Sequence, residues 1–173
     1  MSHTARGYTP ETAEQECRQD PPSDAPDTAA RRRWMAVLAR SEIRELEAAW
    51  RQLATPPSHT WLRRPETGLV MLRARAGGSG AKFNLGEASV TRCALRTDSG
   101  LTGVAYLLGR SHRHAELAAL FDALLQDETR HTELQSGLIA RLAAAQAARR
   151  NAASRKAAAT KVDFYTIVRG ESL

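Results

Sequence analysis

The sequence predicts an α+β fold, and three observations indicate this class. Strand-like segments lie between residues 60 and 108, and short turn-forming runs separate them. Segments with the apolar spacing of helices lie on both sides of this block. The strands follow one another directly, which favours an antiparallel meander over a parallel sheet. We therefore expect a β-meander of about four strands with two N-terminal helices, a packed central helix and a long C-terminal helical arm.

Residues 1–30 differ in composition from the rest of the chain. They have no apolar period, include the run Asp20-Pro21-Pro22-Ser23-Asp24, and carry six acidic residues against two arginines. Such a segment cannot bury enough apolar surface to offset the entropy cost of ordering, so we expect a disordered acidic tail. The remainder, 31–173, is predicted to form the single domain that a chain of 173 residues can support.

Two short helices are predicted before the strands. Trp34 and Leu38 belong to the first, which starts at Arg31. Ser41 stands where it could cap the second, and Pro56-Pro57 ends that helix. The apolar face of the second helix carries Ile43, Leu46, Trp50 and Leu53.

The four predicted strands cover 60–62, 69–76, 82–96 and 101–108. The turns between them are 65–68, 77–80 and 98–100, which contain residues that tolerate positive φ. Gly86, inside the third strand, indicates a β-bulge. Residues 69–74 are apolar on both faces, so we expect helices or another subunit to cover the sheet on both sides there.

The strongest helical pattern follows the strands. Ser111 can cap a helix that we expect to pack on the sheet, and a buried stripe is indicated by the spacing of Leu117, Leu120, Phe121, Leu124 and Leu125. Residues 132–158 form an alanine-rich helix whose later part is basic, so its last turns are expected to project or to lie on a partner. This arm, about 132–173, ends in an apolar segment with the interface candidates Val162, Phe164, Tyr165 and Val168.

Charge and composition limit the classes of function. The net charge is +6, but residues 1–30 carry −4, which leaves +10 on 31–173. A basic domain attracts phosphate-bearing ligands, nucleic acid or acidic protein surfaces, and charge alone leaves the three open. No apolar run is long enough to span a membrane, and the N-terminal segment is unlike a secretory signal. Cys17 and Cys93 lack the spacing of metal ligands, which fits a cytoplasmic protein.

The sequence contains no self-contained catalytic motif. It has no P-loop, nucleophile elbow, HExxH sequence or Cys/His cluster. Catalytic residues are therefore unknown, and an enzyme that acts alone is not expected. The run Gly77-Gly78-Ser79-Gly80 could bind phosphate through backbone N–H groups, but it lies between two strands, which favours a plain hairpin turn.

Residues 109–116 form the best candidate anion site. Arg110, His112 and His114 stand at a predicted helix N-terminus, where N–H groups and the helix dipole favour an anion. The alternative is a solvated cap with His114 packed against its own helix. Two histidines alone do not complete a zinc site, so no metal is expected. Arg75, near the glycine-rich turn, is a further anion candidate, and a structural role is equally open for it.

Glu66 and Arg92 are candidates for a structural ion pair. Hairpin counting around the turn at 77–80 places them opposite each other, provided that the Gly86 bulge does not shift the register.

A series of short motifs runs in a fixed order across about residues 31–172. The motifs are Arg31-Arg32-Arg33-Trp34-Met35, Glu66-Thr67-Gly68-Leu69-Val70, Arg75 with Gly77-Gly78, Thr91-Arg92, Gly109-Arg110, His114-Ala115-Glu116, Asp122-Ala123-Leu124 and Val162-Asp163-Phe164. An ordered series is more specific than any one motif. This series resembles the G subunit of the bacterial carbon–phosphorus lyase system, the PhnG family.

The resemblance implies a subunit that works only within an enzyme complex. The family belongs to a core of G, H, I and J subunits and acts with H, I and a nucleotide-binding L subunit. The expected reaction is a transferase step in which a phosphonate displaces adenine from ATP and gives ribose 1-phosphonate 5-triphosphate. The isolated chain is then expected to be inactive and to bind no cofactor of its own. Glu66, Arg92 and Glu116 match the family pattern without an assigned role.

Two other classes of function stay open. The charge of 31–173 would also suit a nucleic-acid-binding module. The aromatic residues, however, are scattered among apolar ones instead of forming a stacking platform, so we expect no nucleic acid partner. An independent phosphate-ester enzyme using the segment from Arg110 to His114 would require turnover by the single chain.

Overall fold

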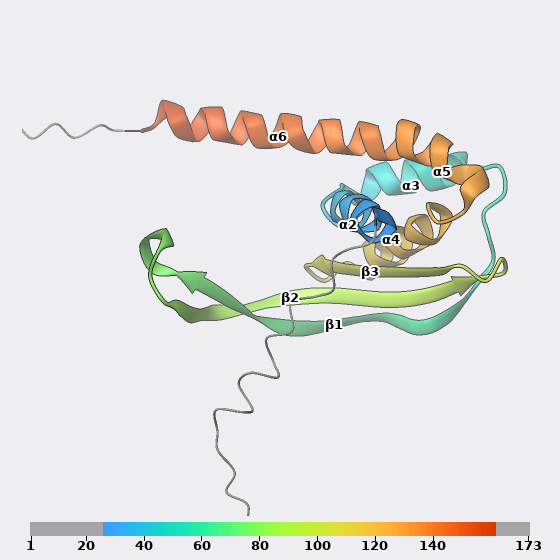
Figure 1. Ribbon diagram of the computed structural model, residues 1–173, viewed down its shortest axis with the longest axis horizontal. Helices are drawn as coiled ribbons and strands as arrows, with labels where there is room; N and C mark the ends of the chain where they lie inside the picture. Colours follow the sequence, from blue (N-terminus) through green and yellow to red (C-terminus); the bar gives the residue numbers. More distant parts are fainter. Residues whose placement is uncertain (1–25, 162–173) are drawn as a thin grey trace, which may run out of the picture. The chain divides into compact units, whose positions relative to one another are not determined.

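The chain divides into two compact units, residues 1–33 and 34–173, and the packing below concerns the second unit. The structure is a computed structural model that describes residues 26–161 (Figure 1). Its elements are helices α2 (Pro26–Leu38) and α3 (Ile43–Gln52), strand β1 (His59–Arg75), the 3₁₀ turn η2 (Ala76–Gly78), strands β2 (Lys82–Thr97) and β3 (Thr102–Leu108), helices α4 (His112–Leu124) and α5 (Glu128–Leu134), the π-helical turn η3 (Gln135–Ile139) and helix α6 (Ala140–Ala159).

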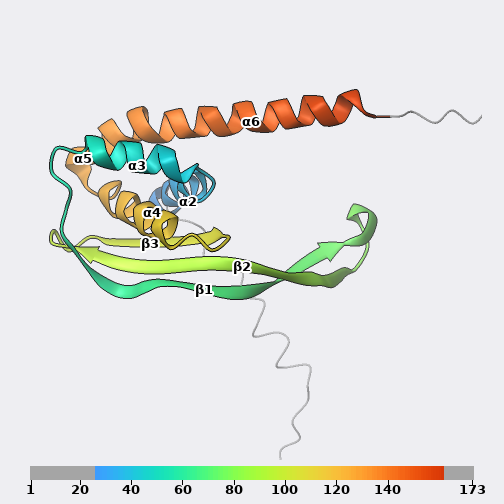
Figure 2. The same cartoon turned by 180° about the vertical axis from the view of Figure 1, so that it is seen from behind.

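The strands form an antiparallel sheet in the order β1-β2-β3, and helices α3, α4 and α6 lie on one side of it (Figures 1 and 2). The α+β class and the meander are therefore confirmed. The prediction of about four strands is wrong, because the segments expected at 60–62 and 69–76 are parts of one strand, β1.

Two register irregularities allow β1 to continue past Pro65, where we expected a turn. The pairing with β2 shifts between Trp61 and Arg63 and again between Arg63 and Glu66. Bulges let a strand continue with residues that do not pair, and β1 is an edge strand, where a proline without an N–H is tolerated.

The other two turns and the bulge near Gly86 agree with the sequence analysis. The register shifts where Leu72 pairs with Gly86 and Arg73 pairs with Asn84. The glycine-rich run is a hairpin turn between β1 and β2, with Gly77 at a φ of 59°. The next turn places Gly100 at a φ of 83°, a conformation that favours glycine.

Helix α4 covers the inner face of β2 and β3 and holds most of the core. Its sheet-facing side carries Ala119 and Asp122, which lie against β3, whereas its buried Phe121 packs edge-on against Trp50 of α3. A large apolar side chain such as Phe121 contributes about 1.5–3 kcal/mol of hydrophobic stabilisation when fully buried. The prediction of a packed central helix is confirmed.

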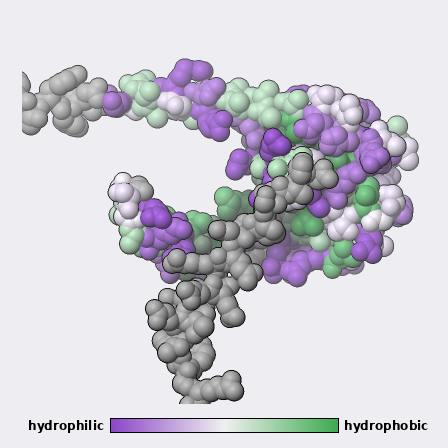
Figure 3. Space-filling view, viewed as in Figure 1, coloured by the Kyte–Doolittle hydropathy of each residue, from purple (hydrophilic) through white to green (hydrophobic). Residues whose placement is uncertain are grey.

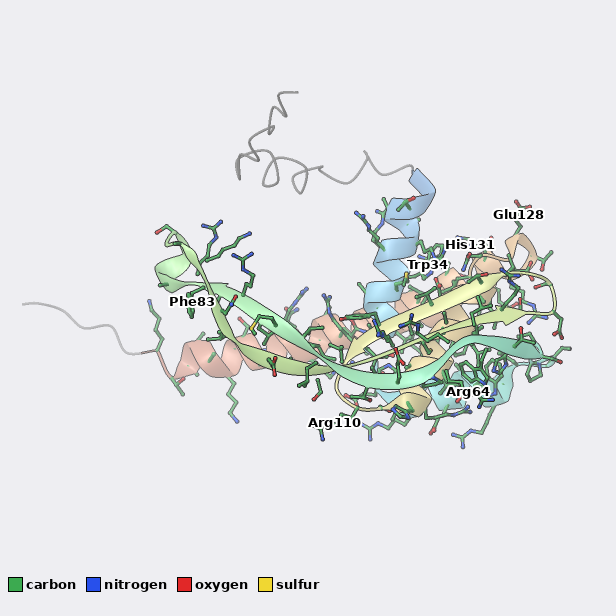
Figure 4. The ribbon with its side chains drawn as sticks, turned by 90° about the horizontal axis from the view of Figure 1, so that it is seen from below. Trp34, Arg64, Phe83, Arg110, Glu128 and His131 are labelled. Atoms are coloured by element: carbon green, nitrogen blue, oxygen red, sulfur yellow. The ribbon has the colours of Figure 1, made fainter. Side chains whose placement is uncertain are left out.

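Asp122 is a carboxylate inside this apolar layer, with no exposed surface. Its Oδ1 accepts a hydrogen bond of 2.9 Å from Nε1 of Trp34, and its Oδ2 accepts one of 2.9 Å from the amide of Val104. The Trp34 ring also packs edge-on against His131, with ring centroids 5.5 Å apart (Figure 4). Asp122 therefore ties α4 to both α2 and β3.

Two helix starts differ from the expectation. Helix α2 begins at Pro26, so residues 26–30, assigned to the tail above, are helical. Helix α3 is capped by Glu42 through a capping box with Glu45 instead of by Ser41. The Ser41 hydroxyl donates to the carbonyl of Leu38 at 2.7 Å, which removes it from the cap.

The C-terminal helical segment is packed at its start and exposed at its end. Side chains of α5, η3 and the first turn of α6 are buried, namely Leu134, Leu138, Ile139 and Leu142. Gln146 then donates to the carbonyl of Val37 at 2.7 Å, while residues 148–161 are all exposed. No helix among residues 26–161 is long and apolar enough to cross a membrane. The interface candidates Val162, Phe164, Tyr165 and Val168 lie outside the described residues.

The Cys93 thiol should be unreactive in the folded protein. It is buried and donates to the carbonyl of Ala115 at 3.2 Å, and burial, with a smaller effect of Glu116, raises its pKa from 9.0 to about 12. In a Cys17→Ser variant we expect a disulfide reagent at pH ~8 to label Cys93 at least ~100-fold faster in urea than in buffer.

The raised pKa of Cys93 also determines the direction in which stability changes with pH. The thiol form is favoured in the folded state, so its contribution to stability is complete below pH 9.0 and is lost as the pH rises toward about 12. This contribution is measured by urea unfolding at pH values on either side of 9. The Cys17→Ser protein is compared with and without Cys93→Ala. In the labelling experiment, equal rates for Cys93 in urea and in buffer would contradict its burial in the folded protein.

Candidate functional site

The predicted anion segment begins at a tight turn between β3 and α4. Gly109 has a φ of 99°, and its carbonyl accepts a hydrogen bond of 2.7 Å from the Thr91 hydroxyl. The Thr67 hydroxyl lies 3.1 Å from that of Thr91 and 3.1 Å from Nε2 of His112. Because Thr91 uses its proton on Gly109, Thr67 donates to Thr91 and His112 donates to Thr67. The chain of donors fixes the Nε2–H form of His112.

Ser111 caps α4, as predicted. Its hydroxyl accepts from the backbone N–H of His114 at 3.3 Å. The imidazole of His114 turns toward the end of α2, where Nε2 donates to the carbonyl of Leu38 at 2.9 Å. His114 is half-buried, so this histidine serves the packing of α4 and differs from the exposed His112.

Arg110 and His112 remain exposed at the start of α4. Arg110 donates through Nε to the Ser89 hydroxyl at 3.2 Å and extends away from the sheet (Figure 4). The next arginine, Arg113, forms an ion pair of 2.9 Å with Glu116. Arg110 and His112 thus contact different strands, through Ser89 of β2 and Thr67 of β1, and both side chains are exposed to solvent.

Arg75 lies elsewhere, at the distal end of the β1–β2 hairpin. Its guanidinium donates to the carbonyl of Gly80 at 3.1 Å, so it ties together its own turn. Figure 4 shows the hairpin end, marked by Phe83, well separated from Arg110. The four anion candidates therefore do not form one site.

Glu66 and Arg92 pair across β1 and β2 as the hairpin counting predicted. Glu66 Oε1 lies 2.7 Å from Nε of Arg92 and 2.9 Å from Nη1 of Arg63. The hydrogen bond from Arg92, with smaller contributions from Arg63, lowers the pKa of the Glu66 carboxyl. All three side chains are about half exposed, so the cluster contributes little to stability and positions charges on the outer face of the sheet.

Large apolar side chains are exposed along the sheet, where we expected a cover on both sides. Beyond α4, the hairpin exposes 62% of Leu69 and 51% of Met71 on the face that the helices cover elsewhere. Figure 3 shows such apolar patches among hydrophilic ones. The others are Leu62, Leu72, Phe83, Leu85, Val104, Tyr106 and Leu108. The chain's described helices do not cover these residues, and a cover by another subunit stays a prediction.

The sequence analysis missed two hollows beside α2, β3 and α6 that have Arg40 in common, and we call the pair a groove. It has an apolar part beside Tyr106 and Leu108 and a basic part beside Arg149 and Arg150, and Arg40 lines both. Arg40 and the α6 arginines are more than a hundred residues apart in sequence. Only the alanine-rich, basic composition of 140–161 signalled an unusual surface.

Metal-ligating side chains do not gather in the part of the chain that the structure describes. Among residues 26–161, no group of three or more His, Cys, Asp or Glu side chains could hold a metal ion.

The sequence as a whole is similar to a curated protein. The alpha-D-ribose 1-methylphosphonate 5-triphosphate synthase subunit PhnG of Rhizobium meliloti (strain 1021) is 43% identical over 149 residues, which are 86% of this chain and 95% of that protein. The family model described as phosphonate metabolism protein PhnG matches residues 29–170. This match begins within α2 and covers the sheet and the other helices described above, so the chain belongs to the PhnG family.

Proposed function

We propose that this chain is the G subunit of an assembly that transfers the ribose 5-triphosphate group of ATP to a phosphonate. The observation that carries the proposal is the similarity to a subunit of a ribose 1-methylphosphonate 5-triphosphate synthase. The two sequences are 43% identical, and the match covers 86% of this chain and 95% of that subunit. In this reaction the bond between adenine and ribose C1 breaks and a bond from a phosphonate oxygen to C1 forms. Adenine leaves with a proton.

The chain's part in the assembly is to support and position other subunits. Two features favour this role: the nine large apolar side chains exposed on the sheet, and a basic α6 whose last residues are exposed. A subunit that buries these surfaces on a partner gains hydrophobic stabilisation that the isolated chain lacks. The proposed partners are the H, I and J subunits and the nucleotide-binding L subunit. ATP is the proposed substrate of the assembly, and the proposed location is the cytoplasm.

The experiment is reconstitution of adenine release. Purified H, I and L subunits from the same source receive ATP and methylphosphonate with and without this chain, and chromatography measures adenine. We expect adenine only when the chain is present, and none from the chain alone. Release at the same rate without the chain would refute the proposal. Retention of the chain by duplex or single-stranded DNA at ~150 mM salt would instead support the nucleic-acid module.

Arg110 and His112 are proposed to face the polyphosphate substrate, since both are exposed at the N-terminus of α4. In the reconstituted assembly, Arg110→Ala with His112→Ala should raise KM for ATP about tenfold, with kcat changed less than about twofold. Arg64→Ala, an exposed arginine on β1, is the matched control and should leave KM unchanged. An unchanged KM in the double variant would assign both residues to the structure of the turn.

A further inference from the structure

We propose that the groove between α2, β3 and α6 binds a segment of a partner subunit that carries apolar side chains next to acidic ones. The inference rests on the proposed function, because the partner is taken to be another subunit of the proposed assembly. The groove itself follows from the residues that line it. We call its two parts the apolar lobe and the basic lobe.

The apolar lobe lies between the end of α2 and strand β3 and has a volume of about 350 Å³. Tyr106 is 52% exposed and Leu108 is 72% exposed along it. Met35 of α2 and Ala39, which directly follows that helix, form the opposite wall. Large apolar side chains grouped around a hollow, instead of scattered singly, mark surfaces that a partner covers.

The basic lobe is a second hollow, and Arg40 lines both lobes. It has a volume of about 310 Å³, and Arg149 and Arg150 of α6 line its far side. Alanine side chains of α6 keep it open, and Gln146 is held by its bond to the Val37 carbonyl. The wall is thus set by packing, while the guanidinium groups are exposed.

The charge of the basic lobe calls for an anionic occupant. Residues 140–161 contain six Lys and Arg and no acidic residue. Glu45 lies 3.9 Å from Arg149, a distance that leaves the guanidinium able to take a closer partner. Carboxylates that approach Arg40 and Arg150 would form charge-assisted hydrogen bonds.

The apolar lobe decides which anion fits. Inorganic phosphate or a triphosphate would satisfy the arginines and leave Tyr106 and Leu108 exposed. A protein segment can bury both lobes at once, because apolar and acidic side chains alternate freely along one chain. The chain's own residues 1–30 are acidic but have no apolar period, so they match the basic lobe alone.

The test compares two matched charge reversals on the full-length chain. Arg40→Glu with Arg150→Glu changes the basic lobe, whereas Arg155→Glu with Lys156→Glu changes the exposed end of the same helix. Binding of each protein to co-expressed H, I and J subunits is measured on a sensor surface, and circular dichroism verifies folding. We expect the groove variant to weaken binding about 100-fold and the control less than about threefold.

A second variant tests the apolar lobe, and crosslinking identifies the occupant. Tyr106→Ala with Leu108→Ala should weaken binding about tenfold. A photoreactive amino acid in place of Ala143, at the basic lobe, should crosslink to a segment of H, I or J that contains apolar and acidic residues. A crosslink to residues 1–25 or to a second copy of this chain would overturn the inference.

The outcomes separate this inference from the proposed function. Failure of the unchanged chain to bind the subunits or to support adenine release would refute the proposed function. If the unchanged chain binds and Arg40→Glu with Arg150→Glu binds equally well, only the groove is refuted. Equal loss in both charge-reversal variants would also refute it, because the binding would then depend on the charge of α6 as a whole.

Discussion

Replacing Asp122 with alanine is expected to lower the free energy of unfolding by about 3–5 kcal/mol, since a buried donor left without a partner costs about 1–3 kcal/mol. The carboxylate is fully buried and accepts from both the Trp34 indole and the Val104 amide. Alanine would leave both donors without their acceptor in an apolar layer. Urea unfolding followed by circular dichroism measures the change.

Three variants distinguish the network from a general effect of losing a charge. Asp122→Asn keeps the shape and one acceptor oxygen, so its loss should be smaller, about 1–3 kcal/mol. Trp34→Phe removes one donor and should cost about 1–2 kcal/mol. Asp98→Ala, in the exposed turn after β2, should change stability by less than about 0.5 kcal/mol. A loss for Asp122→Ala no larger than that for Asp98→Ala would contradict the role of the network.

Local patterns in the sequence were sufficient for most of the elements. The stripe from Leu117 to Leu125 and the cap at Ser111 are local signals, and both appear in the structure as predicted. Counting around one turn placed Glu66 opposite Arg92, and the two residues do pair, although the register shifts at the Gly86 bulge, which the counting assumed would not happen. Such features depend on residues close in sequence or on one hairpin, so the sequence determines them directly.

The predictions that failed depended on what distant residues do. Pro65 looked like part of a turn because an isolated proline interrupts strands, but bulges on an edge strand accommodate it. Ser41 looked like a cap until the structure showed its hydroxyl bonded to Leu38. In both cases a local propensity gave way to the tertiary context.

The candidate sites also contain features that depend on neighbouring residues and features that depend on distant ones. Arg110 and His112 both lie at the start of α4 because only Ser111 separates them in the sequence. The Leu38 partner of His114 and the Trp34 partner of Asp122 come from α2, about eighty residues away, and no local motif indicates them. A single aspartate within the apolar stretch of α4 was the available signal, because a buried carboxylate requires partners.

Gly103→Ala is expected to destabilise the protein by about 3 kcal/mol or more, because overpacking a close contact forces the backbone to move. The φ of Gly103 is not positive, so the requirement for glycine is steric. A Cβ there would overlap the carbonyl oxygen of Ala119 and come within 3.0 Å of the Ala123 Cβ. The oxygen belongs to the helical backbone of α4, which cannot rotate away as a side chain could.

Gly68→Ala provides the matched control, since a Cβ at Gly68 meets nothing within 4 Å. It should change stability by less than about 1 kcal/mol, measured by the same urea unfolding. A movement of α4 away from β3 would also pull Asp122 from the Val104 amide, so Gly103→Ala and Asp122→Ala disturb the same contact. Their combined loss should therefore be smaller than the sum of the two, and an additive double variant would show that α4 and β3 adjust independently at the two positions.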